Sequence, residues 1–176
     1  IEAIGVPHPE VELIIKNGEA VDFSEKVTGS EQWSIYPHFS SLEISQERLR
    51  PLLAIKRFIL DVHLGKLATQ MRLLGFDTLY ENDYSHSQLA HIAKQQQRIV
   101  LTRDIALLKR SIITYGYWLR NQNPDWQLQE ILNRFALFSS ISPFKRCLRC
   151  NGLLISVKKV DIQDQLEPLT KKYYHQ

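Results

Sequence analysis

The strongest constraint on the fold is an alternation of short apolar runs and amphipathic helical patterns between residues 57 and 138. The runs predict strands at 57–61, 76–80, 98–102 and 112–118, and the helical spacing predicts helices at 63–74, 85–96, 104–109 and 124–136. Strands that alternate with helices are typical of a parallel sheet with helices on both faces. We therefore predict an α/β domain over residues 57–138.

Each of the first three predicted strands ends with, or is followed by, an aspartate: Asp61, Asp83 and Asp104. The carboxyl ends of parallel strands meet at one edge of a sheet, which is where ligands bind in open α/β folds. Any one of these aspartates could instead cap the helix that follows it, and for a single aspartate the cap is the better interpretation. Their repetition in equivalent settings favours a shared site.

Three converging carboxylates repel one another unless a cation lies between them. Mg²⁺ prefers a few carboxylates together with water, which leaves positions for phosphate oxygens. A cation held in this way can orient water and neutralise the charge that develops on a phosphodiester under attack. The pattern therefore predicts a Mg²⁺ or Mn²⁺ site made by Asp61, Asp83 and Asp104.

Composition limits the functional class only weakly. The 176-residue chain is 44% hydrophobic and 23% charged, which is ordinary for a globular protein, and its net charge of +3 permits a polyanionic partner without demanding one. No apolar run of about 18 residues predicts a membrane span, and no signal peptide is visible. We expect a cytoplasmic protein without a membrane partner. Because the sequence starts at Ile1 and not at Met, we expect the native N-terminus to precede it.

Basic residues next to the predicted acids are candidates for contact with a polyanion. Lys66 and Arg103 lie close to the acids in sequence, and Arg120 follows the last predicted strand. Contacts from such residues to phosphates would supply affinity without reading a base sequence. For each of these residues taken alone, a solvated surface charge is the better interpretation. His63 could be a metal ligand, although a surface or capping histidine is the simpler interpretation.

Residues 1–40 form a separate β-rich segment. Val11–Ile15 and Ala20–Phe23 are predicted strands, joined by the hairpin signal Asn17-Gly18, and Trp33–Tyr36 is a third strand. This order resembles the C-terminal half of a ubiquitin-like β-grasp domain, which implies a protein partner. A β appendage without activity of its own is the better interpretation of the segment taken alone. Residues 41–56 are predicted to be a linker.

Residues 139–176 contain both cysteines of the chain, in the motif Cys147-x-x-Cys150, followed by a predicted strand at Leu153–Val157. Two such cysteines are half of a tetrahedral zinc site. A redox role is disfavoured, because no strand-to-helix turn carries the motif. We predict a small zinc-ribbon-like segment that is incomplete in these residues.

Several blocks of the chain resemble, in the right order, one known family. The blocks are Phe58–Ala68, Met71–Tyr80, Asn82-Asp83, Leu101–Asp104 and Arg146–Gly152. They are similar to the PIN-like ribonuclease domain found at the C-terminus of mutator-type exonucleases, which bacteria and archaea carry as a separate protein. An N-terminal ubiquitin-like segment is known among its bacterial members, so the resemblance covers nearly the whole chain.

The resemblance implies a PIN-like fold and metal-dependent hydrolysis of RNA. It matches Asp61 and Asp104 to acidic metal-site positions and Asp83 to the third acid. A fourth acid is common after the fourth strand, but here that region offers only Asn121, Asn123 and Asp125.

The same resemblance implies that Cys147 and Cys150 begin a zinc ribbon, whose second cysteine pair follows a segment like Leu166–Gln176. The main alternative to a ribonuclease is an adaptor that binds RNA or protein without catalysis, with structural acids.

Overall fold

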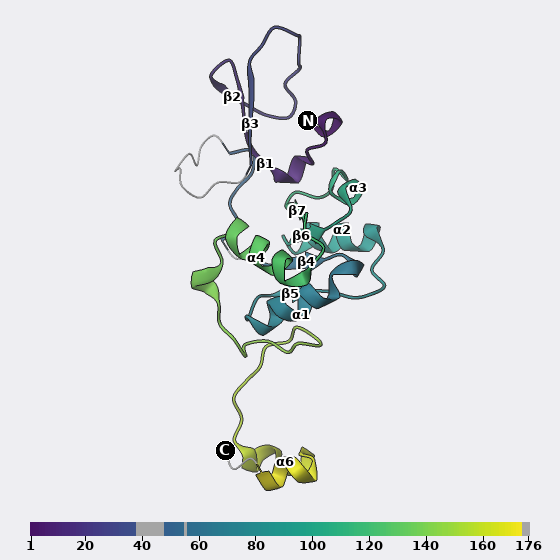
Figure 1. The fold of residues 1–176 in the computed structure, drawn as a ribbon, viewed down its shortest axis with the longest axis vertical. Helices are drawn as coiled ribbons and strands as arrows, with labels where there is room; N and C mark the ends of the chain where they lie inside the picture. The colour runs from purple at the N-terminus through teal and green to yellow at the C-terminus, as the bar shows by residue number, and fades with distance from the viewer. Residues whose placement is uncertain (38–47, 55, 174–176) are drawn as a thin grey trace.

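A four-stranded parallel sheet forms the centre of the computed structural model, which describes residues 1–37, 48–54 and 56–173 (Figure 1). Its strands are β4 (Phe58–Leu60), β5 (Thr78–Leu79), β6 (Ile99–Thr102) and β7 (Gly116–Trp118). They lie in the order β5-β4-β6-β7, and all neighbouring pairs are parallel. The predicted α/β architecture is confirmed.

Helices cover both faces of this sheet. Helices α1 (Gly65–Leu73) and α4 (Pro124–Arg134) contribute to one buried apolar cluster, and α2 (His86–Gln95) and α3 (Ile105–Leu108) to the other. A 3-10 turn, η3 (Val62–Leu64), leads from β4 into α1. The strands are buried on both faces, which explains why they read as continuous apolar runs instead of alternating patterns.

Strand β4 shows how the two clusters divide. Phe58 and Leu60 belong to the cluster with α1 and α4, whereas Ile59 belongs to the cluster with α2 and α3. All three side chains are fully buried. The alternation follows from the period of two in a strand, since successive side chains point to opposite faces.

Local signals determine where the helices begin. Ser85 caps α2 in a capping box with Gln88, and Asn123 caps α4 with Pro124 at the first helical position. Gly75 follows α1 with a φ of 92°, and a Cβ atom there would lie 2.1 Å from the Ser142 carbonyl oxygen. Only glycine fits both this left-handed backbone and the close approach of the later chain.

The N-terminal segment is a three-stranded antiparallel sheet in the order β2-β1-β3. Its strands are β1 (Val11–Lys16), β2 (Glu19–Val21) and β3 (Trp33–Pro37), preceded by the 3-10 turns η1 (Glu2–Ile4) and η2 (His8–Glu10). The predicted hairpin turn has positive φ values at Asn17 and Gly18, 50° and 93°. Such angles are those of a type I′ turn, whose twist matches that of the flanking strands.

This segment packs along β7, the outer strand of the parallel sheet. The Glu10 carboxylate accepts a hydrogen bond of 2.5 Å from the Trp118 backbone N–H. Arg50 donates to the carbonyl oxygens of Thr114 and Pro9, at 2.8 and 2.9 Å. These contacts satisfy part of the backbone at an exposed sheet edge, which would otherwise be open to pairing with another chain.

The connecting and C-terminal regions contain little regular structure. Of the predicted linker, residues 41–47 and 55 lie outside the described part of the chain, and residues 48–54 form neither helix nor strand. Downstream come η4 (Phe138–Ser140), α5 (Lys159–Ile162), η5 (Gln163–Gln165) and α6 (Pro168–Tyr173). No helix in the described ranges has the length and apolar character that a bilayer span requires.

Two sequence predictions need correction. The strand predicted at Leu153–Val157 is wrong: only one bridge forms, between Arg146 and Leu153. The side chains that follow are exposed, Ile155 by 79%, so no packed surface supports an extended strand here. The strand predicted at 112–118 is shorter, Gly116–Trp118, because the chain turns at residues 111–112 before it joins the sheet.

Candidate functional site

Asp61 lies directly after β4 and is almost fully buried, with 2% of its surface exposed. Its Oδ1 accepts a hydrogen bond of 2.8 Å from the Val62 N–H. Its Oδ2 accepts one of 2.6 Å from the Thr102 hydroxyl. A buried carboxylate needs such donors, because desolvation of an unpaired charge is costly.

Asp104 lies two residues after β6 and caps α3. Its Oδ1 accepts a hydrogen bond of 2.8 Å from the Ala106 N–H. Its own N–H donates to the Thr102 hydroxyl oxygen at 2.8 Å. The buried Thr102 hydroxyl therefore links the two aspartates, accepting from one and donating to the other. This link is possible because β4 and β6 are direct neighbours in the sheet.

A histidine that the sequence analysis did not select lies between these two carboxylates. His86 is the first residue of α2. Its Nε2 is 3.9 Å from Asp61 Oδ1, and its Nδ1 is 3.8 Å from Asp104 Oδ2. The two aspartates thus flank the same imidazole ring, at distances longer than hydrogen bonds.

The third predicted acid lies in a different setting. Asp83 is exposed in the turn that precedes α2. Within residues 1–37, 48–54 and 56–173, no three His, Cys, Asp or Glu side chains are grouped closely enough to hold a metal ion. The assignment of Asp83 as a third ligand stays a prediction.

A groove of 450 Å³ opens beside Asp61, lined by η3, the start of α1 and residues from later loops. Lys66 and Arg103, both predicted to contact substrate, line it together with His63. The Tyr80 hydroxyl forms part of the wall and donates to the Val62 carbonyl oxygen at 2.9 Å. The lining includes the sequence neighbours of the two aspartates, Val62 and Arg103, but not Asp61 or Asp104 themselves.

Arg120 was also predicted to contact substrate, but the groove lining does not include it. Its guanidinium forms an ion pair of 2.8 Å with Glu10 and lies over the rings of Tyr117 and Trp118. The ion pair belongs to the interface with the N-terminal segment, whereas the two rings belong to β7 of the parallel sheet. A role for Arg120 in substrate binding stays a prediction.

The region where a fourth acid could lie is occupied by structural contacts. Asp125 accepts a hydrogen bond of 2.6 Å from Gln70. Asn121 donates to the Glu130 carboxylate at 3.0 Å, and Asn123 caps α4. Burial would raise the pKa of Glu130, but hydrogen bonds from Asn121 and from the Tyr117 hydroxyl lower it.

The two cysteines form a compact turn between residues 145 and 154. The Cys147 N–H donates to the Gly152 carbonyl oxygen at 2.8 Å. The backbone N–H groups of Cys150 and Arg149, followed by the Cys150 side chain, lower the pKa of the Cys147 thiol. An N–H group directed at a sulfur favours the thiolate, which is the form that binds metals.

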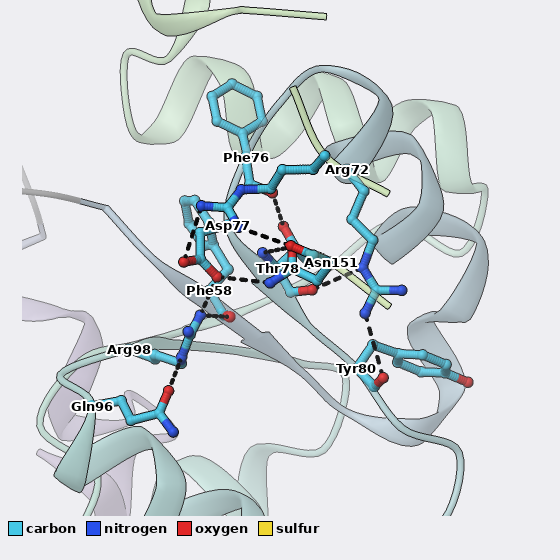
Figure 2. Close-up of polar contacts among 10 residues, drawn as sticks. Phe58, Arg72, Phe76, Asp77, Thr78, Tyr80, Gln96, Arg98 and Asn151 are labelled. Atoms are coloured by element: carbon cyan, nitrogen blue, oxygen red, sulfur yellow. Dashed lines mark hydrogen bonds and ion pairs between the residues drawn. The ribbon is translucent and has the colours of Figure 1, made fainter. Parts of the chain in front are cut away.

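This cysteine turn is joined to the parallel sheet by polar contacts (Figure 2). The Asn151 side chain is buried and accepts a hydrogen bond of 2.9 Å from the Thr78 N–H of β5. The buried Arg72 of α1 donates to the carbonyl oxygens of Leu148 and Arg149, at 2.9 and 2.8 Å. The residues between the cysteines are therefore tied to the core of the domain.

Asp77 completes this network at the start of β5. Its carboxylate accepts from Arg98 at 2.7 Å, from Asn151 at 2.9 Å and from Arg146 at 3.2 Å. Burial would raise the pKa of Asp77, but the hydrogen bonds from Arg98 and Asn151 lower it below its ordinary value. Figure 2 shows this carboxylate among its donors.

The sequence analysis missed Thr102 and His86. Thr102 is the last residue of an apolar strand, two positions before an aspartate, and a polar residue at that position was an available signal. His86 follows the capping Ser85, and nothing in its spacing indicates the direction of its side chain. Only the packing of α2 against the sheet places it between the aspartates.

Comparisons with known proteins give a family for both parts of the chain. A family model described as Mut7-C RNAse domain matches residues 56–176, which is more than half of the chain. A second, described as Mut7-C ubiquitin, matches residues 1–43. No curated protein and no solved structure matches the chain. The two matches agree with the resemblance in the sequence and with the observed α/β fold, and the chain belongs to the Mut7-C RNase domain family.

Proposed function

We propose that this protein is a metal-dependent ribonuclease that hydrolyses RNA phosphodiester bonds at Asp61 and Asp104. The observation that supports the proposal best is the placement of these two carboxylates at the carboxyl ends of the adjacent strands β4 and β6. They are linked there by a buried hydroxyl and lie near a groove with two cationic side chains. That edge is the usual position for a ligand in a parallel sheet.

The donor atoms suit Mg²⁺ or Mn²⁺. Both ions prefer carboxylate oxygens, and Mg²⁺ is commonly held by one or two carboxylates together with water and substrate phosphates. Each of the aspartate oxygens that has a protein donor accepts one hydrogen bond in the contacts above. Since a carboxylate oxygen has two lone pairs, each of these oxygens keeps one lone pair for a cation. Such an ion, when bound, supplies charge neutralisation at the phosphate and a lower pKa for bound water.

The residues of the chain then have separate tasks. Asp61 and Asp104 hold the ion, and the Thr102 hydroxyl fixes the distance between them. Lys66 and Arg103 bind phosphates of the RNA backbone along the groove, which provides affinity that depends on salt and not on base sequence.

Cleavage of a single-stranded RNA with Mn²⁺ tests the proposal. We expect Asp104→Asn to lower the cleavage rate at least about 100-fold. Residues that support metal ligands contribute up to about 100-fold in activity, and loss of a ligand itself should cost at least as much. The variant should melt near the wild-type temperature, since asparagine caps a helix as well as aspartate does. Asp83→Asn, tested in parallel, shows whether the third predicted acid takes part. A wild-type rate for Asp104→Asn would favour the non-catalytic adaptor.

We also propose that Cys147 and Cys150 supply two thiolate ligands to a structural zinc ion. The support is the lowered pKa of the Cys147 thiol and the turn that holds both cysteines. Zn²⁺ should raise the melting temperature, because a ligand of the native state adds to its stability. Cys147→Ser should remove this rise, whereas Asp61→Asn should keep it. No response to Zn²⁺ in a protein that also carries the implied second cysteine pair would exclude the assignment.

A further inference from the structure

Arg72 is a buried arginine whose hydrogen bonds in the described structure go to backbone carbonyl oxygens. From the last turn of α1, its Nε donates to the Thr78 carbonyl at 2.9 Å. Its Nη1 donates to the carbonyls of Leu148 and Arg149 at 2.9 and 2.8 Å, and its Nη2 to that of Tyr80 at 3.4 Å (Figure 2). One guanidinium therefore joins the cysteine turn to the end of β5.

Strand β5 depends on this junction, because it is short and lies at an edge of the described sheet. It contains only Thr78 and Leu79, and in that sheet it pairs with β4. Asn151 accepts a hydrogen bond of 2.9 Å from the Thr78 N–H, while Arg72 donates to the Thr78 carbonyl oxygen. Side chains thus satisfy both backbone polar groups of Thr78, where a further strand could otherwise pair.

Tyr80 directly follows β5 and connects this edge to the groove. Its hydroxyl donates to the Val62 carbonyl oxygen at 2.9 Å, and the Val62 N–H is the donor to Asp61 Oδ1 at 2.8 Å. Its ring lies so close to the start of α1 that a Cβ atom on Gly65 would be 2.8 Å from the hydroxyl oxygen. Tyr80 thus contacts the chain on both sides of η3, at its first residue and at the glycine after its last.

We propose that Arg72 is a positioning residue for the candidate active site: it fixes the end of β5, so that Tyr80 holds η3 and the Asp61 carboxylate in place. Each step from the cysteine turn through Arg72 and Tyr80 to Val62 is a hydrogen bond. This inference rests on the proposed function, since it assigns a support to one of the two carboxylates. It makes the cysteine turn part of the framework of the groove.

Hydrogen exchange of the backbone amides in η3, measured on the whole chain, tests this path without requiring activity. The Val62 and Leu64 amides both donate to Asp61, and β6 serves as the internal reference for global unfolding. Tyr80→Phe keeps the ring and loses the hydroxyl, so both amides should exchange about fivefold faster, the factor expected for one ordinary hydrogen bond. Arg72→Lys replaces the planar guanidinium with a single ammonium group and should have a similar effect.

Arg98→Lys is the matched control. Arg98 is a second buried arginine of the same polar network, and its hydrogen bonds in the described structure go to Gln96, Phe58 and Asp77. None of these acceptors belongs to β5, to Tyr80 or to the cysteine turn. Arg98→Lys should therefore lower stability without changing the exchange of η3 relative to β6.

A double variant, Arg72→Lys with Tyr80→Phe, measures whether the two residues act together. It should exchange no faster than Tyr80→Phe alone, because two changes that break one path do not add. Additive effects, an unchanged η3 in Arg72→Lys, or an increase shared by Arg98→Lys would each overturn the positioning role. Melting curves show which variants fold, and Arg72→Gln replaces Arg72→Lys if the lysine variant does not.

RNA cleavage separates failure of this inference from failure of the proposed function. Where the wild type cleaves, kcat of Arg72→Lys and Tyr80→Phe should fall about tenfold with little change in KM, as for residues that support a metal ligand. An unchanged kcat in either variant would overturn the inference. If the wild type does not cleave RNA, the proposed function is wrong, and the exchange measurement still decides whether Arg72 holds Asp61 in place.

Discussion

The two edges of the parallel sheet carry aspartates in opposite settings. At the amino end of β5, Asp77 accepts hydrogen bonds from two arginines and an asparagine. At the carboxyl ends of β4 and β6, Asp61 and Asp104 accept from one hydroxyl and two backbone N–H groups, and the nearest basic side chain, His86, stays beyond hydrogen-bond distance.

This difference indicates which carboxylates are structural and which are free to act. The donors around Asp77 come from Arg98, just before β6, and from the C-terminal region, and the C-terminal donors join the cysteine turn to the sheet (Figure 2). Those around Asp61 and Asp104 come mainly from the adjacent backbone, so they position the carboxylates without neutralising them. A carboxylate with no cationic partner at close range is the one that can attract a cation.

Asp77→Asn should cause the largest change in stability. Removing one member of a buried ion pair leaves the other charge without compensation, which costs roughly 3 kcal/mol. Arg98 and Arg146 are both largely buried here. We expect the free energy of unfolding in urea to fall by about this amount, while RNA cleavage per folded molecule stays at the wild-type level. If folded Asp77→Asn lost RNA cleavage, Asp77 would contribute to activity as well as to stability, contrary to this prediction.

Acidification should act mainly through the structural carboxylates. The pKa of Asp77 is lowered from 3.8, and that of Glu130 from 4.5. A lowered pKa in the folded state means that the ionised group stabilises the protein at pH values above its ordinary pKa, and this contribution is lost as the pH falls through the lower folded value.

The wild-type urea midpoint should therefore decrease as the pH falls below about 4. Asp77→Asn should show a flatter decrease over the same range, although it starts from a lower midpoint, because it has no carboxylate at position 77. Parallel curves for the two proteins would show that Asp77 contributes nothing to acid sensitivity.

Thr102→Val tests how the free carboxylates are positioned, with a smaller expected effect. The change removes the hydroxyl between Asp61 and Asp104, and supporting residues of a metal site commonly contribute 10- to 100-fold in affinity or activity. We expect the cleavage rate to fall about tenfold, with little change in RNA affinity. Thr102→Ser keeps the hydroxyl and should restore most of the rate. If serine and valine behave alike, the hydroxyl link is unimportant.

Charge removal in the groove should have the smallest effect. Lys66→Ala and Arg103→Ala should each reduce the dependence of RNA binding on salt, by a slope of about 0.7 for one phosphate contact on a single strand. Arg120→Ala should leave the slope unchanged and lower the melting temperature, because its partner is Glu10. If all three variants reduced the salt dependence of RNA binding equally, Arg120 would also contact RNA.

Much of the fold follows from local patterns. The Asn17-Gly18 hairpin was predicted from the sequence, and the capping box at Ser85 and the Asn123-Pro124 start of α4 are equally local, because caps and tight turns depend on neighbouring residues. The strand predicted at 153–157 was wrong because a strand also depends on contacts with distant parts of the chain. Its apolar run has no packed surface in the described structure, and propensity alone does not hold a strand in place.

The sequence by itself determined the order of strands and helices and the placement of Asp61 and Asp104 just after two apolar strands, since hydrophobic periodicity and chain order are local. The tertiary structure decided which carboxylates meet and which are neutralised. It pairs β4 with β6, packs α2 so that His86 enters the site, and brings Asn151 to Asp77 across 74 positions of the chain. These contacts depend on strand order and helix packing, which are set by burial of the whole core and not by any single segment.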